Sequence, residues 1–425
     1  MFRYILSTAT AALFSGSVLA AEMADSDQRL QTLEQRLQIL ETAAPVKTVA
    51  SSRNAFNPAI ALILSGIYTN LSQSPEGYHI SGFALPEDSE IGPGSRGLNL
   101  GESELVISSN IDPYLYGNFV LALTPEGGAE VEEGYIQTIA LSNGFSLKAG
   151  RFLSGIGYNN ARHAHVWDFV DAPLAYQALL GGRYGDDGVQ MKWLAPTEIF
   201  FELGAEALRG AGFPASERDK NGSGAATLFA KLGGDAGASS WLAGISLLST
   251  SPEGREVADI DLADAKVINR FSGTSKLWIA DVVWSYAPNG NKVPGNFKLQ
   301  AEYLLRDERG DLAYDVGGVE NTAPFSARQS GVYVQGIYQF MPRWHVGLRA
   351  ERLDAGTVDY GANNAMLAQR DFNPAKRSVM VDYSPSEFSR IRLQYARDES
   401  RQDVSDNQLF LQYQMSLGAH GAHQF

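Results

Sequence analysis

The chain has 425 residues, no cysteine, 43 glycines and a formal net charge of −14. Without cysteine, the protein cannot use disulfide bonds, cysteine-ligated zinc or thiol chemistry. The acidic balance argues against a nucleic-acid partner, because binding to phosphates needs a basic surface.

The first predicted elements are an export signal and a short helix. Residues 1–20 hold one basic residue, an apolar run and small residues before Ala21, which is typical of a secretory signal peptide. A transmembrane helix is the alternative, but the run is short and broken by polar residues. Within residues 21–56, leucines at spacings of three and four predict a helix over 25–43 that ends before Pro45. We expect a periplasmic coiled-coil stalk that supports a homotrimer; the alternative is an amphipathic helix on the protein's own surface.

From residue 57 to the end, apolar residues recur at every second position. In the last such stretch Leu409, Leu411 and Tyr413 share one face, while Gln408 and Gln412 lie on the other. Runs of about ten alternating residues fit a tilted strand that crosses a bilayer, whereas strands of soluble sandwiches have about five or six residues. The pattern predicts an all-β fold, a transmembrane antiparallel β-barrel over residues 57–425.

The links between these strands alternate in length. Short links rich in Pro, Gly or Asn lie near 111–114, 142–144, 195–198, 234–239, 287–296, 341–343 and 384–389. Mostly longer polar segments lie between them, near 72–97, 126, 157–188, 211–224, 252–275, 310–328, 357–373 and 403. The strands between these links number sixteen. Short periplasmic turns and long outer loops are typical of outer-membrane barrels. The terminal Phe425 resembles the signal that the outer-membrane assembly machinery recognises.

The polar face of the strands is predicted to line a lumen, because sixteen strands leave an interior wide enough for water. The pore-lining candidates are Lys298, Glu302, Arg306, Arg349, Glu351, Arg390 and Arg392, and the same face carries Glu102, Glu104, Glu202, Glu206 and Asp281. Charges of both signs could set up a transverse field across a pore. The alternative is solvated wall charge with no role in selection.

The segment 158–187, between the fifth and sixth predicted strands, contains His163 and His165. Two histidines two residues apart point the same way in an extended segment, and imidazole and carboxylate both suit zinc. Oxygen ligands could come from Asp168, Asp171, Asp186 and Asp187. We predict a weakly bound divalent cation such as zinc and no other cofactor. The alternative is that the histidines only brace the segment against the barrel wall.

Residues 150–210, which include the His-x-His-x-x-Asp-Phe-Val-Asp segment, and the ending "LGAHGAHQF" resemble outer-membrane proteins labelled zinc-regulated and TonB-dependent-receptor-like. Porins fold the third long loop into the barrel, so a porin-like resemblance implies that 158–187 forms the constriction. TonB-dependent transporters carry a large N-terminal plug inside a barrel of about 22 strands. Residues 21–57 leave no room for such a plug, so the expectation is porin-like passage.

These features predict a porin-like channel for passive diffusion of small solutes or ions in the bacterial outer membrane, with a bias toward zinc or other divalent metals. One alternative is a TonB-dependent-type receptor for a metal or metallophore, and another is an adhesin or structural anchor. Enzyme activity is not expected, because no "GxSxG" motif is present and the histidines lie among acids instead of beside a nucleophile. The expected partners are outer-membrane lipid, the assembly machinery and identical subunits.

Overall fold

The computed structural model describes residues 58–418, except 88, 125–126, 217–219, 290–293 and 368–371. The predicted signal peptide (1–20), the stalk and linker (21–56) and Phe425 lie outside the described residues, and they stay predictions.

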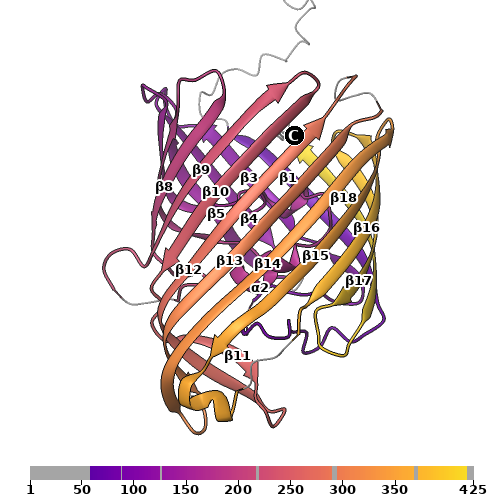
Figure 1. The fold of residues 1–425 in the computed structure, drawn as a ribbon. Coiled ribbons are helices and arrows are strands. Elements are labelled where there is room, and N and C mark those ends of the chain that lie inside the picture. Colours follow the sequence, from indigo (N-terminus) through magenta and orange to yellow (C-terminus); the bar gives the residue numbers. More distant parts are fainter. Residues whose placement is uncertain are drawn as a thin grey trace, which may run out of the picture. The chain divides into compact units, whose positions relative to one another are not determined.

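The strands form one antiparallel sheet that closes on itself, because β1 (Ala59–Leu71) pairs along its length with β18 (Asp406–Gly418). Figure 1 shows the resulting barrel. The other strands are β2 (Gly97–Leu100), β3 (Ser103–Asn110), β4 (Leu115–Leu123), β5 (Ala129–Thr138), β6 (Phe145–Leu153), β7 (Gly185–Leu194), β8 (Phe200–Leu208), β9 (Ala225–Ala236), β10 (Ser239–Thr250), β11 (Arg255–Ile260), β12 (Lys266–Tyr286), β13 (Phe297–Tyr314), β14 (Asn321–Met341), β15 (Trp344–Asp359), β16 (Ala375–Ser386) and β17 (Ser389–Glu399).

The 18 strand segments make a barrel of sixteen strands, as the sequence predicts. Two of the sixteen are interrupted. β3 and β2 pair one after the other along β1, and β10 and β11 do the same along β12. Each pair therefore acts as one broken strand of the wall. The fold is the predicted all-β, closed antiparallel barrel.

The side chains follow the period-two pattern in the sense expected for a membrane barrel. Outward residues such as Leu348, Leu393 and Tyr413 are apolar and exposed, whereas inward residues such as Gln300 and Gln394 are buried. This is the reverse of a soluble protein, and it places an apolar belt around the outside. No helix among the described residues is both long and apolar enough to cross a membrane.

The predicted loops at 252–275 and 310–328 need correction. β12 and β14 have 21 residues each and β13 has 18, so these strands continue well past the predicted strand ends. Together with β11 and the short helix η2 (Gly361–Ala365) they form an extension beyond the barrel on the long-loop side (Figure 1). Val267, Leu312, Tyr314 and Leu367 form a small apolar core there, which explains why these polar-looking segments stay in the sheet.

Candidate functional site: the inward loop and its contacts with the barrel wall

The segment 154–184 between β6 and β7 lies inside the barrel. It contains the 3-10 helix η1 (Ala164–Val166) and the helix α2 (Leu174–Leu180), and every residue of α2 is buried. α2 packs against β13, β14 and β15 (Figure 1). Apolar residues of the loop and of the inner wall form one core, which includes Leu179, Leu304 and Leu353. At this height the interior is therefore filled by the loop, and an open water-filled lumen of sixteen-strand width is not present.

One wall residue, Glu302 on β13, fixes the start of the inward segment. Its carboxylate accepts hydrogen bonds from the backbone amides of Tyr158 and Asn159, both at 3.0 Å. It also accepts from the hydroxyl groups of Tyr176, at 2.7 Å, and Tyr333. Four donors satisfy both oxygens of this buried carboxylate, so the loop cannot move here without leaving a buried charge unpaired.

Two further wall glutamates bind loop atoms in the same way. Glu206 on β8 accepts from the Ser154 hydroxyl and from the Gly155 amide, the latter at 2.9 Å. Glu351 on β15 accepts from the amide of Leu174, the first residue of α2, at 2.6 Å. A carboxylate at the beginning of a helix satisfies an amide that has no partner within the helix. The entry of the loop and the start of α2 are thus both held by the wall.

Wall cations hold the aspartates of the loop. Asp168 pairs with Lys298 at 2.7 Å, and Asp171 pairs with Arg349 and Lys376, both at 2.7 Å. Burial by itself raises the pKa of both carboxyl groups, but the adjacent cations outweigh it and lower both pKa values below the ordinary range. Both aspartates are therefore ionised at neutral pH and anchor the loop to β13, β15 and β16.

The same wall also binds loop backbone oxygens. The guanidinium groups of Arg390 and Arg392 donate to the carbonyl of Trp167, at 3.2 Å and 2.6 Å. Arg390 donates as well to the carbonyl of His165 at 2.7 Å. These bonds satisfy carbonyls in and just after the short helix η1, which is shielded from bulk water.

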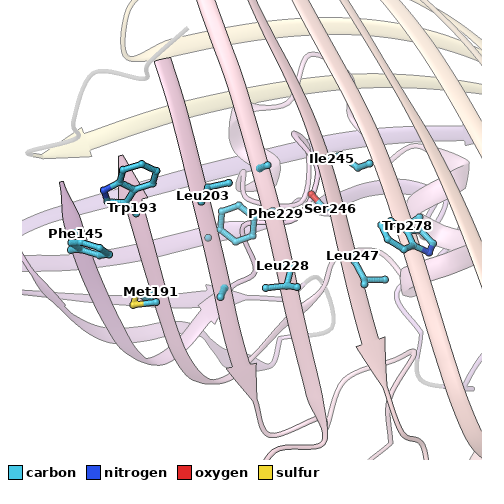
Figure 2. A pocket seen from close by; sticks show the side chains of 13 residues that line it. Phe145, Met191, Trp193, Leu203, Leu228, Phe229, Ile245, Ser246, Leu247 and Trp278 are labelled. Atoms are coloured by element: carbon cyan, nitrogen blue, oxygen red, sulfur yellow. The ribbon is translucent and has the colours of Figure 1, made fainter. Parts of the chain in front are cut away.

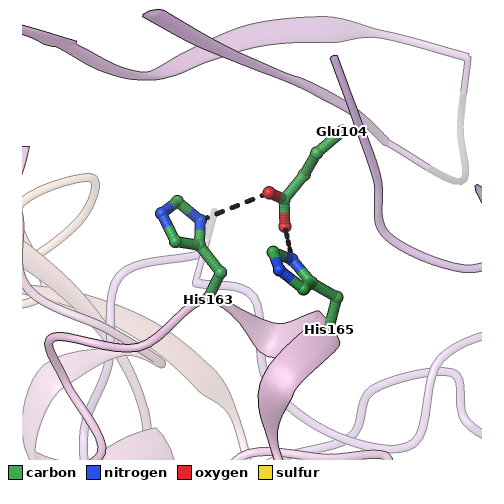
Figure 3. Close-up of side chains that lie close together, drawn as sticks. All are labelled: Glu104, His163 and His165. Carbon is green, nitrogen blue, oxygen red and sulfur yellow. Dashed lines mark hydrogen bonds and ion pairs between the residues drawn. The ribbon is translucent and has the colours of Figure 1, made fainter. Parts of the chain in front are cut away.

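A histidine–glutamate cluster lies between the loop and strands β3 and β5. It is defined by His163, His165, Glu104, Glu132 and Glu133. His163 Nδ1 is 3.1 Å from a Glu132 oxygen and 3.4 Å from Glu104, and its Nε2 is 3.2 Å from Glu133. His165 Nδ1 is 2.8 Å from the other oxygen of Glu104 (Figure 3). Ligand atoms of Glu104, His163 and His165 all lie within 4.8 Å of one another, which fits a small cation.

A β-bulge builds this cluster. The β4–β5 pairing shifts by one residue at Glu132, so Val120 pairs with Glu133 and Leu121 with Val131. Consecutive residues of a regular strand point to opposite faces, but an extra residue in a bulge breaks the alternation. Glu132 and Glu133 can therefore both contact His163 inside the barrel.

The charge around His163 favours its protonated form. Burial lowers the pKa of the imidazole, but the bonds to Glu132 and Glu133 and the charge of Glu104 outweigh it and hold the pKa well above its usual value. A metal ion would have to displace this proton, because a protonated ring cannot bind a metal. The cluster is thus suited to weak, pH-dependent binding of a cation.

The predicted ligand set needs correction at all four aspartates. Asp168 and Asp171 contact wall cations, as described above, and do not join the histidines. Asp186 and Asp187 belong to strand β7 instead of the loop. Asp186 accepts from the amide of Gly210 at 2.6 Å, and Asp187 pairs with Arg151 at 2.8 Å. The carboxylates beside the histidines come from β3 and β5. The loop places His163 and His165 beside those strands, and it places Asp168 and Asp171 beside β13, β15 and β16.

The seven predicted pore-lining residues face inward, but most of them do not line open space. Glu302, Arg306, Arg349, Glu351 and Arg392 are at most 4% exposed. The inward loop contacts Glu302, Arg349, Glu351 and Arg392, whereas Arg306 bonds to Gln329 and lies over the ring of Phe213. Only Lys298 and Arg390 stay partly exposed. Sequence reasoning missed Lys376, Glu132, Glu133 and Arg183. Arg183, near the end of the inward loop, pairs with Glu102 at 2.6 Å and with Glu132 at 2.7 Å. Lys376 follows the inward phase of its strand and could have been found from that signal, whereas the bulge at Glu132 leaves no pattern in the sequence.

A hollow lies on the outer wall of the barrel across β6–β12. Its volume is ≈570 Å³, and Met191, Leu203, Leu228, Ile245 and Trp278 line it (Figure 2). These side chains point away from the interior and are exposed. The hollow belongs to the apolar belt, so it lies outside any path through the barrel.

Fold and site together define a class: a sixteen-stranded outer-membrane-type barrel of porin architecture with one loop folded inside. No protein-family model matches the chain. The chain belongs to the same family as an uncharacterised protein of Aquifex aeolicus (strain VF5), to which it is 30% identical over 424 aligned positions that cover 93% of this chain and 86% of that protein.

Solved structures share the fold. The outer membrane channel DcaP of Acinetobacter baumannii has a TM-score of 0.51 at 15% identity, covering 85% of this chain and 97% of that chain. A loop L8 deletion mutant of OmpT, an outer membrane protein of Vibrio cholerae, has a TM-score of 0.51 at 12% identity, covering 85% and 99%. The bacterial outer membrane, the localisation expected from the sequence, agrees with this fold and with the apolar belt. The described residues contain the barrel and its loops but no plug domain of a TonB-dependent receptor.

Proposed function

We propose that the protein is a passive diffusion channel of the bacterial outer membrane whose width is set by the inward loop. The observation that carries this proposal is the loop itself. Glu206, Glu302, Glu351 and the wall cations fix it to the inside of the barrel. A fixed internal segment narrows the passage through the barrel. An anchor or adhesin has no need of a polar interior arranged around such a loop.

Single-channel recording in planar lipid bilayers tests the proposal. The purified full chain should give stepwise conductance. Deletion of residues 161–177 should raise it, because the deletion removes the first four residues of α2 and both anchoring aspartates. A milder variant, Asp168→Asn with Asp171→Asn, covers the case in which the deletion does not fold. Lys220→Gln, in an exposed loop, is the control. Absence of conductance in the folded protein would favour a structural anchor. Conductance that stays unchanged after the deletion would place the constriction elsewhere.

We further propose that the histidine–glutamate cluster is a weak binding site for divalent cations such as zinc. The ligand distances support this, and the high pKa of His163 makes the expected zinc effect grow as pH rises. A transport site should bind weakly, because ions must leave again. Replacing both His163 and His165 by Ala should remove zinc block of the channel while leaving potassium conductance in place. His79→Ala, on an exposed loop, is the matched histidine control.

If the double alanine variant changes potassium conductance and zinc block together, the histidines only brace the loop. If zinc has no effect on the unmodified channel, the proposal of a cation-binding site is wrong, whereas the proposal of a diffusion channel is unaffected. A TonB-dependent-type receptor, the remaining alternative, predicts that transport of a metal or metallophore in cells collapses when the TonB system is absent.

A further inference from the structure

Three lysines on neighbouring strands face the interior below the loop, toward the short turns. Lys148 is the fourth residue of β6 from the turn, and Lys192 is two residues from the turn end of β7. Lys231 lies on β9. Their strand neighbours Leu147, Met191 and Leu232 point outward and are exposed, so the period-two alternation directs the lysines inward. This group is called the lysine cluster below.

The lysine cluster carries more positive than negative charge. Among the described residues, the carboxylate paired with it is Glu202, which lies 3.2 Å from Lys192. Lys231 donates to the backbone carbonyl of Gly157 at 3.0 Å, and Lys148 lies over the Tyr135 ring at 4.2 Å from its centre. Two of the three ammonium groups thus contact uncharged partners, and no carboxylate in the described chain forms an ion pair with them.

Water reaches this part of the interior. The side chain of Lys192 is 32% exposed and that of Lys298, across the barrel near the turn end of β13, is 29% exposed. Wall residues at loop height are buried, for example Glu302 at 1%. Side chains inside a closed barrel can be exposed only where solvent-sized space adjoins them. Lys192 and Lys298 therefore adjoin accessible space, and each is paired with one carboxylate, Glu202 and Asp168.

The histidine–glutamate cluster lies nearer the other end. Glu104 is the second residue of β3 and Glu132 the fourth of β5, both counted from the long-loop side. The histidine–glutamate cluster and the lysine cluster thus occupy different heights along the barrel. The formal net charge of the whole chain, −14, says little about the charge met by an ion inside.

We propose that the turn-side half of the passage selects small anions, and that the lysine cluster is the selectivity-determining group. This inference rests on the proposed channel function. Rings of Lys or Arg favour anions in pores, and a confined opening focuses the field of fixed charges. A chloride ion passing the loop would meet Lys148, Lys192 and Lys231 on this side of the wall, whereas a potassium ion would meet Glu202 and Asp281 there.

Reversal potentials in a potassium chloride gradient across a planar bilayer test the proposal. The unmodified channel should prefer chloride over potassium. The triple variant Lys148→Gln, Lys192→Gln and Lys231→Gln should lower the chloride-to-potassium permeability ratio at least about twofold, with the larger effect at low salt because charges are screened less there. Glu202→Gln should shift the ratio in the opposite direction.

The matched control removes the same charge outside the barrel interior: Lys220→Gln, Lys266→Gln and Lys276→Gln, whose side chains are exposed. This control should leave the ratio unchanged. If the triple interior variant does not fold, the single variant Lys192→Gln replaces it. A cation-selective channel, or equal ratios in the interior variant and the control, would overturn the inference while leaving the channel intact. A folded protein without conductance would instead overturn the proposed function.

Discussion

At the scale of single residues, the carboxylates of the interior have two distinct roles. Glu302 is a fully satisfied acceptor for four loop and wall donors, whereas Glu202 is paired with one partly exposed lysine. Both face inward, Glu302 on β13 and Glu202 on β8, and the local sequence does not tell them apart. Their surroundings do, because of the two only Glu302 accepts hydrogen bonds from the inward loop. We expect stability to depend on the first and ion selectivity on the second.

Glu302→Gln should detach the start of the inward loop. The neutral amide offers one acceptor oxygen to four donors, and each buried donor left without a partner costs about 1–3 kcal/mol. The midpoint of urea unfolding in detergent should therefore fall clearly. Glu202→Gln is the matched control and should change the free energy of unfolding by about 0–1 kcal/mol, because its ion pair is partly exposed. Equal midpoints for both variants would show that the loop is held elsewhere.

Asp168 and Asp171 give the anchoring of the loop a defined pH dependence. Their pKa values are lowered in the folded protein, so their contribution to stability is fully present above the unfolded value of about 3.9 and is lost as pH falls through the lowered values. Conductance should stay constant between pH 7 and about pH 4.5 and rise in stronger acid. The Asp168→Asn, Asp171→Asn variant should show the raised conductance already at pH 7. A variant that matches the unmodified channel at every pH would contradict this.

At the scale of elements, the long strands show where the membrane ends. On the outward face of β13, Leu299 and Tyr303 are followed by Asp307 and Arg309. Apolar outward residues suit lipid, and charged ones do not. The change marks the border between the membrane belt and the extension, so the extension is a sheet in water stabilised by its own small core.

Shortening the β13–β14 hairpin should leave the channel intact. We expect that replacing residues 311–324 by an Asn-Gly turn keeps the barrel resistant to unfolding by detergent and preserves conductance, because the removed residues contact neither the membrane nor the inward loop. Heat-modified mobility on SDS gels and bilayer recording measure both properties. A barrel that no longer assembles would show that the extension is needed to pair β12–β15.

At the scale of the whole molecule, the homotrimer stays a prediction. It rests on the leucine spacing over 25–43, which lies outside the described residues. Two heptads are too short for a stable coiled coil alone, so the barrels must supply most of the association.

Removal of residues 25–43 should weaken the trimer without unfolding the barrel. The expected result is a trimer that dissociates at lower temperature in mild detergent, measured by native mass spectrometry or cross-linking. Unchanged thermal dissociation would indicate that this helix does not contribute to association, and a monomer in the unmodified protein would contradict the trimer itself.

The sequence by itself determined the fold class, the sixteen strands and the outward and inward faces, because alternation is local and each strand must separately match lipid on one side. It also singled out the inward loop by its place in the strand order. Only the tertiary structure decided which charges meet. Asp171 and Lys376 are 205 positions apart, and the inward fold of the loop brings Asp171 to β16. The bulge at Glu132 and the covering of Arg349 and Glu351 by the loop likewise depend on contacts between distant segments, which no local pattern encodes.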